Sequence, residues 1–131
     1  QLDSFVEKRR KIAKIYDEEF AKLPVDIPQS NAEFRARSAL HLYQLHVDWK
    51  QFDFTRSDFM EKLRNLGIGS QVHYIPIHKQ SFYARHGAKM PDSFVNSEMH
   101  YYKCISLPIH PGMTLNDIER VVHAVKDSLI K

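Results

Sequence analysis

The sequence predicts an α+β domain in which a small antiparallel sheet of about three strands is packed with helices. Stretches with apolar residues every three or four positions are typical of amphipathic helices, and they occupy residues 2–23, 55–66 and 114–129. Short apolar runs are typical of buried strands, and they occupy residues 38–47, 68–72 and 104–107. A sheet of so few strands is stable only when other elements cover it. The helices and strands are therefore expected to form one unit.

Length and composition favour one ordinary globular domain over residues 1–131. The chain is 43% hydrophobic and 27% charged, a balance that excludes fibrous and low-complexity classes. A formal net charge of +3 is small and mixed along the chain, so nucleic acid is not an expected partner.

No apolar run is long enough to span a membrane, and no leader is visible at the start. Cys104, the single cysteine, cannot form an internal disulfide, which is compatible with a reducing compartment. We therefore expect a cytoplasmic protein without a membrane partner. The first residue is Gln1 and not Met, which indicates either processing or a piece of a longer polypeptide.

The first helix is expected to end before Pro24, because proline interrupts the helical hydrogen bonds. Its apolar stripe is formed by Leu2, Phe5, Ile12, Tyr16, Phe20 and Leu23. Nothing nearby in the sequence shares this stripe, so we expect the helix to pack on something close by. The polar, proline-containing residues 24–37 are expected to form a connection, and the run 38–47 is apolar on both faces, which predicts a strand covered on both sides.

Two helices carry the signature of a capping box, in which Thr55 precedes Asp58 and Thr114 precedes Asp117 by three residues. Gly67 is a natural left-handed end for the first of them, and its expected inner stripe is Phe59, Leu63 and Leu66. The last helix has the clearest stripe, formed by Ile118, Val121, Val122, Val125 and Leu129. Two shorter helices are expected between them. One follows Pro76 and ends at Gly87, and the other is capped by Ser93 and buries Phe94, Val95, Met99 and Tyr102.

Residues 73–80 contain the densest unusual chemistry, with His, Tyr, His, Lys and Gln placed around Pro76 at a predicted strand end. Polar groups in such a loop are well placed to orient a ligand. Elsewhere we expect His41, His100 and His123 to be core residues and Cys104 to be a structural thiol. The aromatic residues Phe82, Tyr83, Tyr101 and Tyr102 are likewise expected in the core.

No metal site is expected, because His73 and His78 lie five residues apart and His41 and His46 point to opposite faces of their strand. The sequence also lacks a nucleophile turn, a phosphate-binding glycine loop and a matched carboxylate pair. The residues alone therefore predict a ligand-facing loop without a complete catalytic set.

Two motifs, residues 67–78 (GIGSQVHYIPIH) and residues 106–114 (SLPIHPGMT), resemble the C-terminal end of the DegT/DnrJ/StrS family of pyridoxal phosphate-dependent sugar-nucleotide aminotransferases. The order of the other elements is also similar, and the matching residues are Arg10, Ile12, Ala13, Tyr16, His41, Leu42, Tyr43 and Arg56. Among subgroups, these motifs are most similar to those of the transaminases that make UDP-4-amino-4,6-dideoxy-N-acetyl-altrosamine for pseudaminic acid.

This resemblance implies the small domain of a fold-type I aminotransferase whose large, cofactor-binding domain is absent from residues 1–131. In the family, that domain carries the Schiff-base lysine, the Asp that faces the pyridine nitrogen and the phosphate cup. Lys50, Lys79 and Lys103 do not match the lysine's motif, so no catalytic residue is assigned. The isolated chain is expected to bind no pyridoxal phosphate and to be inactive. Whether the whole protein keeps the lysine is open, since a few relatives replace it and catalyse dehydration.

The resemblance also implies substrates and partners for the whole protein, which would be a homodimer that moves an amino group from an amino acid, expected to be glutamate, to a UDP-linked 4-keto-6-deoxy sugar. His73 would hydrogen-bond the sugar or a phosphate, and Tyr74 would pack on it or donate its hydroxyl. His78 would either join them or brace the loop, and all three also have a purely structural interpretation.

Two other hypotheses remain. One is a stand-alone, non-catalytic binding module for a nucleotide-sugar or an anionic polymer, and the other is an interaction domain without a ligand.

Overall fold

A computed structural model describes residues 1–85 and 94–130. Its helices are α1 (Leu2–Phe20), α2 (Ala32–Arg37), α3 (Arg56–Asn65), α4 (Ser81–Arg85), α5 (Val95–Lys103) and α6 (Leu115–Leu129). Its strands are β1 (Val25–Asp26), β2 (Tyr43–Val47) and β3 (Cys104–Leu107). Two short 3-10 helices are η1 (Trp49–Gln51) and η2 (Ile77–Lys79).

The three strands form one antiparallel sheet in the order β1-β2-β3, which confirms the predicted fold class. The predicted identity of one strand is wrong, however. The third strand is β1, which lies in the segment expected to be a connection, where Val25 pairs with Val47. Residues 68–72 make only a single bridge, between Gln71 and Ser106. Gly69 and Ser70 interrupt the apolar pattern there, so the segment has no continuous face to bury.

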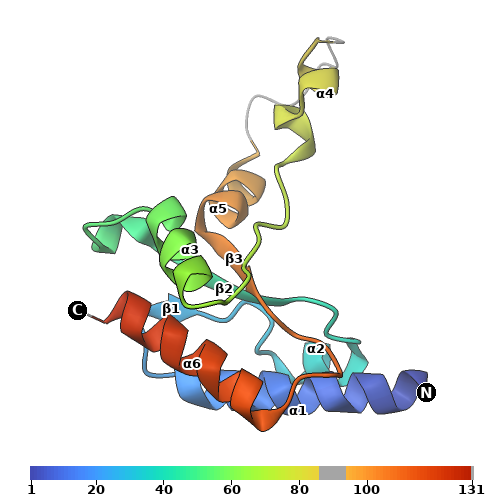
Figure 1. Ribbon diagram of the computed structural model, residues 1–131. Coiled ribbons are helices and arrows are strands. Elements are labelled where there is room, and N and C mark those ends of the chain that lie inside the picture. The colour runs from blue at the N-terminus through green and yellow to red at the C-terminus, as the bar shows by residue number, and fades with distance from the viewer. Residues whose placement is uncertain (86–93, 131) are drawn as a thin grey trace.

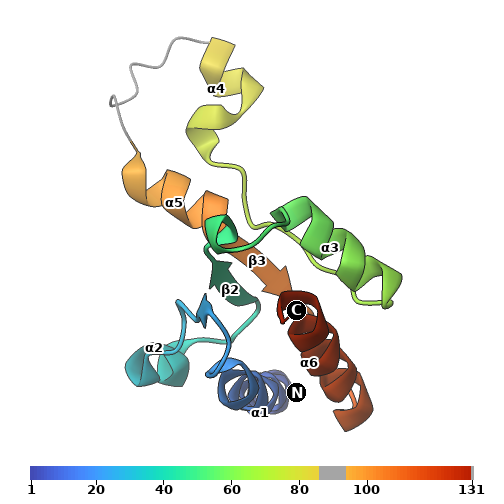
Figure 2. The ribbon, with the colours of Figure 1, turned by 90° about the vertical axis from the view of Figure 1, so that its left-hand side faces the viewer.

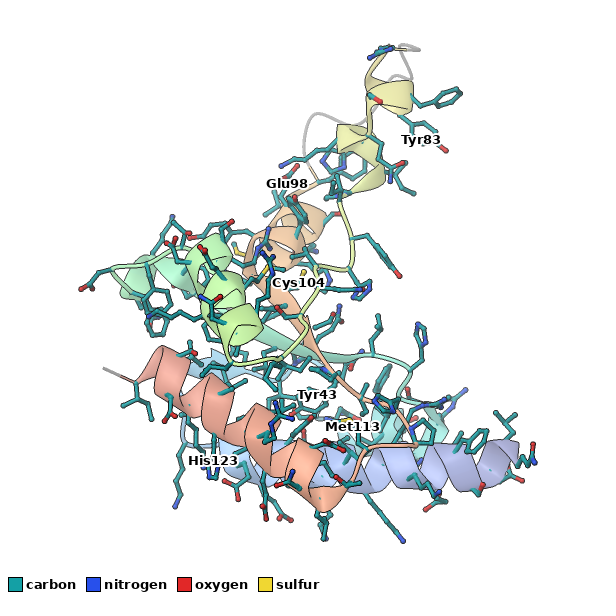
Figure 3. All side chains as sticks on the ribbon, in the orientation of Figure 1. Tyr43, Tyr83, Glu98, Cys104, Met113 and His123 are labelled. Carbon is teal, nitrogen blue, oxygen red and sulfur yellow. The ribbon has the colours of Figure 1, made fainter. Side chains whose placement is uncertain are left out.

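The two faces of the sheet differ in chemistry because side chains alternate along a strand. Tyr43, Leu45 and Val47 of β2 are buried in the apolar core, and Figure 3 places Tyr43 on the side of α1 and α6. The intervening Gln44 and His46 face the other way and pair across the sheet with Ser106 and Cys104. The second face of β2 is polar and not apolar as expected, because the strand begins only at Tyr43. The predicted coverage on both sides is confirmed, since Gln44 is buried and His46 is half-buried.

Helices α1, α3 and α6 cover the apolar face, with α6 packed against both α1 and α3 (Figures 1 and 2). The predicted stripe of α6 is buried throughout. That of α1 is buried only over its second half, at Ile12, Tyr16 and Phe20, while Leu2 is 70% exposed. The start of α1 therefore exposes the apolar side chains of Leu2 and Phe5, which another surface could cover.

Both predicted capping boxes are present, at Thr55 with Asp58 and at Thr114 with Asp117. Asn31 caps α2 with its side chain alone, which accepts hydrogen bonds from the backbone of residues 33 and 34. Asx side chains compete well for these free helix N–H groups, which explains a helix inside the predicted connection. Leu66, expected on the inner stripe of α3, is half exposed, because it lies beyond the last helical residue.

Residues 75–85, here called the arm, project away from the sheet and end in α4 (Figures 1 and 2). Helix α5 packs against β2, but its apolar residues Val95, Met99 and Tyr102 are exposed, so their expected burial is wrong. Phe82 and Tyr83 on the arm are exposed as well. The predicted helix end at Gly87 and cap at Ser93 lie outside the described residues. Among the described helices, none is long and apolar enough to cross a lipid bilayer.

We predict that Gly67→Ala lowers the free energy of unfolding by about 1–2 kcal/mol, because Gly67 has a φ of +76°, which a side chain disfavours. The new Cβ would also lie 3.1 Å from Nη2 of Arg120. The matched control is Gly69→Ala, whose Cβ would meet no atom within 4 Å. Urea unfolding of both variants checks this, and equal losses at the two glycines would contradict the assignment.

We also predict that the chain becomes less stable as pH falls below about 6.5, the ordinary pKa of a histidine. Burial lowers the pKa of His46, the neighbouring charges of His100 and Lys103 lower it further, and Asp26 opposes them. The unfolded chain therefore binds more protons here than the folded chain, so this contribution is full above that pH and is lost as pH falls toward the folded pKa. Urea unfolding between pH 5.5 and 7.5 should show a smaller slope in His46→Gln and an unchanged slope in the exposed control His123→Gln.

Candidate functional site

The candidate site begins where the chain leaves α3 and crosses the polar face of the sheet. The backbone N–H and carbonyl of Gln71 both bond Ser106 of β3, at 3.1 and 2.7 Å. This bridge fixes the chain two residues before His73. The loop is therefore anchored to β3 by this bridge, but the prediction that it follows a strand over residues 68–72 is wrong.

The carbonyl oxygen of His73 accepts hydrogen bonds from three different elements. Gln44 of β2 donates its side-chain N–H over 3.3 Å, and His100 of α5 donates from Nε2 over 3.2 Å. The Cys104 thiol of β3 points at the same oxygen from 3.8 Å. Figure 3 places Cys104 on the α5 side of the sheet. The backbone at His73 is therefore held by side chains from the polar face of the sheet and from α5.

The His73 imidazole is half-buried, and its Nδ1 lies 2.8 Å from the Ser106 hydroxyl. The Tyr74 ring stands edge-on to it, with 4.4 Å between ring centroids, and the peptide bond that joins the two residues is cis. Among the described residues, none hydrogen-bonds Nε2 of His73. That nitrogen is the polar atom of the ring left for a ligand.

Tyr74 is 66% exposed, and the apolar side chains of Ile75 and Ile77 after it are also exposed. Pro76 between them is buried and fixes the direction of the chain there. A phenol hydroxyl, an imidazole nitrogen and two exposed aliphatic side chains therefore lie close together along this segment of the chain. Such a segment can bind a ligand that combines hydroxyl or phosphate oxygens with an apolar ring face.

The structure places His78 apart from His73 and Tyr74. Its Nε2 lies 2.5 Å from Oε1 of Glu98 on α5, and its ring stacks on Phe94 with 4.5 Å between centroids. Lys79 bonds the other oxygen of the same carboxylate, and these partners hold the pKa of Glu98 below its ordinary value. Glu98 therefore ties the arm to α5, near the base of the arm in Figure 3.

Sequence reasoning missed the groups that hold the site, which are Gln44, His46, His100 and Ser106. A signal was available, because Gln44 and His46 alternate with apolar residues in one strand, as Ser106 does with Ile105 and Leu107 in the other. His100 was expected in the core, but it is half-buried and takes part in the polar network. The same expectation is wrong for His41 and His123, which are exposed. Cys104 is buried, and burial raises the pKa of its thiol, as expected of a structural cysteine.

Within residues 1–85 and 94–130, no three His, Cys, Asp or Glu side chains are grouped to hold a metal ion. The described lysine nearest to the candidate loop is already paired with other groups. Lys79, the lysine closest in sequence to His73, is paired with Glu98 and lies over the Tyr101 ring. Its ammonium group is therefore already engaged by Glu98 and Tyr101.

Comparison with known proteins places the chain in a family. The profile of the DegT/DnrJ/EryC1/StrS aminotransferase family matches residues 1–126. An uncharacterized protein of Methanocaldococcus jannaschii is 40% identical over 119 residues, which cover 91% of this chain and 31% of that protein. The spore coat polysaccharide biosynthesis protein SpsC of Bacillus subtilis is 34% identical over 128 residues, which cover 97% of this chain and 33% of SpsC.

Among solved structures, Helicobacter pylori PseC, an aminotransferase involved in the biosynthesis of pseudoaminic acid, matches with a TM-score of 0.80 and 28% identity. The match covers 95% of this chain and 33% of PseC. The chain thus spans about a third of the length of the curated relatives it matches. The family match over nearly the whole chain, together with the shared fold, establishes that this chain belongs to the DegT/DnrJ/EryC1/StrS aminotransferase family.

Proposed function

We propose that this chain is the small, C-terminal domain of a pyridoxal phosphate-dependent sugar aminotransferase. The complete, cytoplasmic enzyme moves an amino group from an amino acid, which we take to be glutamate, to a nucleotide-linked 4-keto-6-deoxy sugar. Its product enters the synthesis of a surface polysaccharide or a nonulosonic acid. Membership of the family supports this proposal, and so does the length of the relatives, of which this chain matches about a third.

The observation that carries the proposal is the surface formed by His73 and Tyr74. Their backbone is fixed by bonds to the sheet and to α5, whereas the Tyr74 side chain is exposed and no described residue hydrogen-bonds Nε2 of His73. Groups on a rigid backbone bind a ligand with a smaller loss of conformational entropy than groups on a mobile loop. In the complete enzyme, His73 hydrogen-bonds a sugar hydroxyl or a phosphate oxygen, and Tyr74 packs on the sugar or donates its hydroxyl. His78 supports this surface through Glu98.

The chemistry of transfer belongs to the cofactor, which acts as an electron sink when it is bound. We take the lysine and the phosphate-binding groups that hold it to lie in a large domain outside residues 1–131, as membership of the family implies. This domain then orients the sugar nucleotide and covers one side of the cleft. The isolated 131-residue chain is accordingly inactive as a transaminase.

For the substrate, we propose a UDP-linked sugar of the pseudaminic acid route, with amination as in UDP-4-amino-4,6-dideoxy-N-acetyl-altrosamine. The likeness to PseC at 28% identity supports this choice. The exposed start of α1, at Leu2 and Phe5, and the exposed Ile75 and Ile77 suit contacts with the large domain and with the second subunit of a homodimer.

Expression of the complete reading frame that contains this chain tests the proposal. We expect the purified protein to show the absorbance of bound pyridoxal phosphate and to aminate a UDP-4-keto-6-deoxy sugar with glutamate. The absence of both cofactor absorbance and turnover would contradict the proposed function.

In that enzyme, His73→Ala and Tyr74→Ala should each raise the KM for the sugar nucleotide about tenfold, the equivalent of one hydrogen bond. The half-reaction with glutamate should proceed at its normal rate, because neither residue is assigned to the amino donor. His123→Ala on α6 is the matched control, since this histidine is exposed and lies outside the site. An unchanged KM in both site variants would remove His73 and Tyr74 from the substrate-binding surface.

A further inference from the structure

We propose that His100 and His46 are positioning residues, which hold the His73–Tyr74 backbone in place through one defined pair of imidazole tautomers. Neither is assigned to contact with substrate. The proposal rests on the proposed function, because it concerns how the sugar-nucleotide surface is oriented.

The geometry is a chain of hydrogen bonds that starts on the sheet and ends at the candidate site. Nε2 of His46, on β2, lies 2.9 Å from Nδ1 of His100, on α5. The two rings meet edge to face, with 4.9 Å between centroids. Nε2 of His100 then lies 3.2 Å from the carbonyl oxygen of His73. The path from His46 on β2 to the backbone beside Tyr74 thus contains two imidazoles, and Gln44 of the same strand bonds that carbonyl directly.

The chemistry of these groups fixes where the protons are when both rings are neutral. A carbonyl oxygen can only accept, so Nε2 of His100 carries a hydrogen. A neutral imidazole has one N–H, so Nδ1 of His100 is bare and accepts. The hydrogen between the rings must then come from Nε2 of His46. Both histidines are therefore Nε2–H tautomers, and either opposite tautomer leaves one of the two bonds without a proton.

Helix α5 connects these hydrogen bonds to the candidate site. It holds the segment after Gln71 at two points: His100 bonds the carbonyl of His73, and Glu98 bonds the side chains of His78 and Lys79. The His73 carbonyl belongs to the peptide unit that continues into Tyr74. A tilt of this peptide therefore reorients both candidate ligand-binding side chains, and loss of the His100 bond leaves the carbonyl with Gln44 and the Cys104 thiol as its only donors among the described residues.

Long-range proton–nitrogen NMR of the imidazole rings in the 131-residue chain tests the tautomers directly. At pH 8 we expect His46 and His100 to show the Nε2–H pattern, with the ring hydrogens protected from exchange, while the exposed His123 provides a solvent-averaged reference. An Nδ1–H pattern for His100 would overturn the proposal.

The functional test compares pairs of variants in the complete enzyme. His100→Gln and His46→Gln keep a donor nitrogen near the position of Nε2, whereas His100→Leu and His46→Leu remove it. We expect the leucine variants to raise the KM for the sugar nucleotide at least fivefold and the glutamine variants to stay within twofold. The half-reaction with glutamate should be unchanged in all four, and His123→Leu is the control. An equal rise in KM in the leucine and glutamine variants would show that the two histidines act only through packing, and would contradict the proposal.

The two proposals can fail separately. If the unmodified enzyme does not aminate a sugar nucleotide, the proposed function fails. The positioning claim can then still be tested by NMR of the 131-residue chain. The amide NMR signals of residues 73 and 74 should shift in His100→Leu and return toward their original positions in His100→Gln. Amide signals that do not move in His100→Leu would overturn the positioning claim.

Discussion

The alternation of side chains across β2 and β3 is the constraint on which the rest of this structure depends. Because these strands pair in one register, Tyr43 with Leu107 and Leu45 with Ile105 face the helical core. The same register places Gln44 beside Ser106 and His46 beside Cys104 on the opposite face. A shift of one residue would exchange the two sets and bury the polar groups against α1 and α6. The apolar core thus specifies the register, and the register assembles the polar face.

The polar face in turn determines what the loop after α3 can do. A loop that leaves a sheet is ordinarily mobile, but here the carbonyl of His73 receives donors from β2 and α5. Helix α5 extends this support to the arm through Glu98. The outcome is an exposed Tyr74 side chain next to a half-buried His73, on backbone that is hydrogen-bonded to the sheet and to α5. Rigid placement of this kind is what a substrate-orienting domain needs.

The sequence was sufficient for features that depend on local chemistry. The capping boxes at Thr55 and Thr114, the left-handed Gly67 and the stripe of α6 all follow from interactions within a few residues, and all are present. It was insufficient where distant segments compete. Residues 68–72 have strand-like composition, yet β1 takes the place as third strand because Val25 pairs with Val47. The site loop could be located, but the bond between His46 and His100 joins residues 54 positions apart, and no periodicity within either segment predicts it.

A crystal structure of the complete polypeptide with a bound UDP-sugar tests the central claim most directly, because it observes the contact itself. The account predicts that sugar or phosphate oxygens lie within about 3 Å of His73 Nε2 or the Tyr74 hydroxyl. It also predicts that the His73 carbonyl keeps its bonds to Gln44 and His100. A ligand bound elsewhere, with His73 and Tyr74 covered by the protein's own polypeptide, would contradict it.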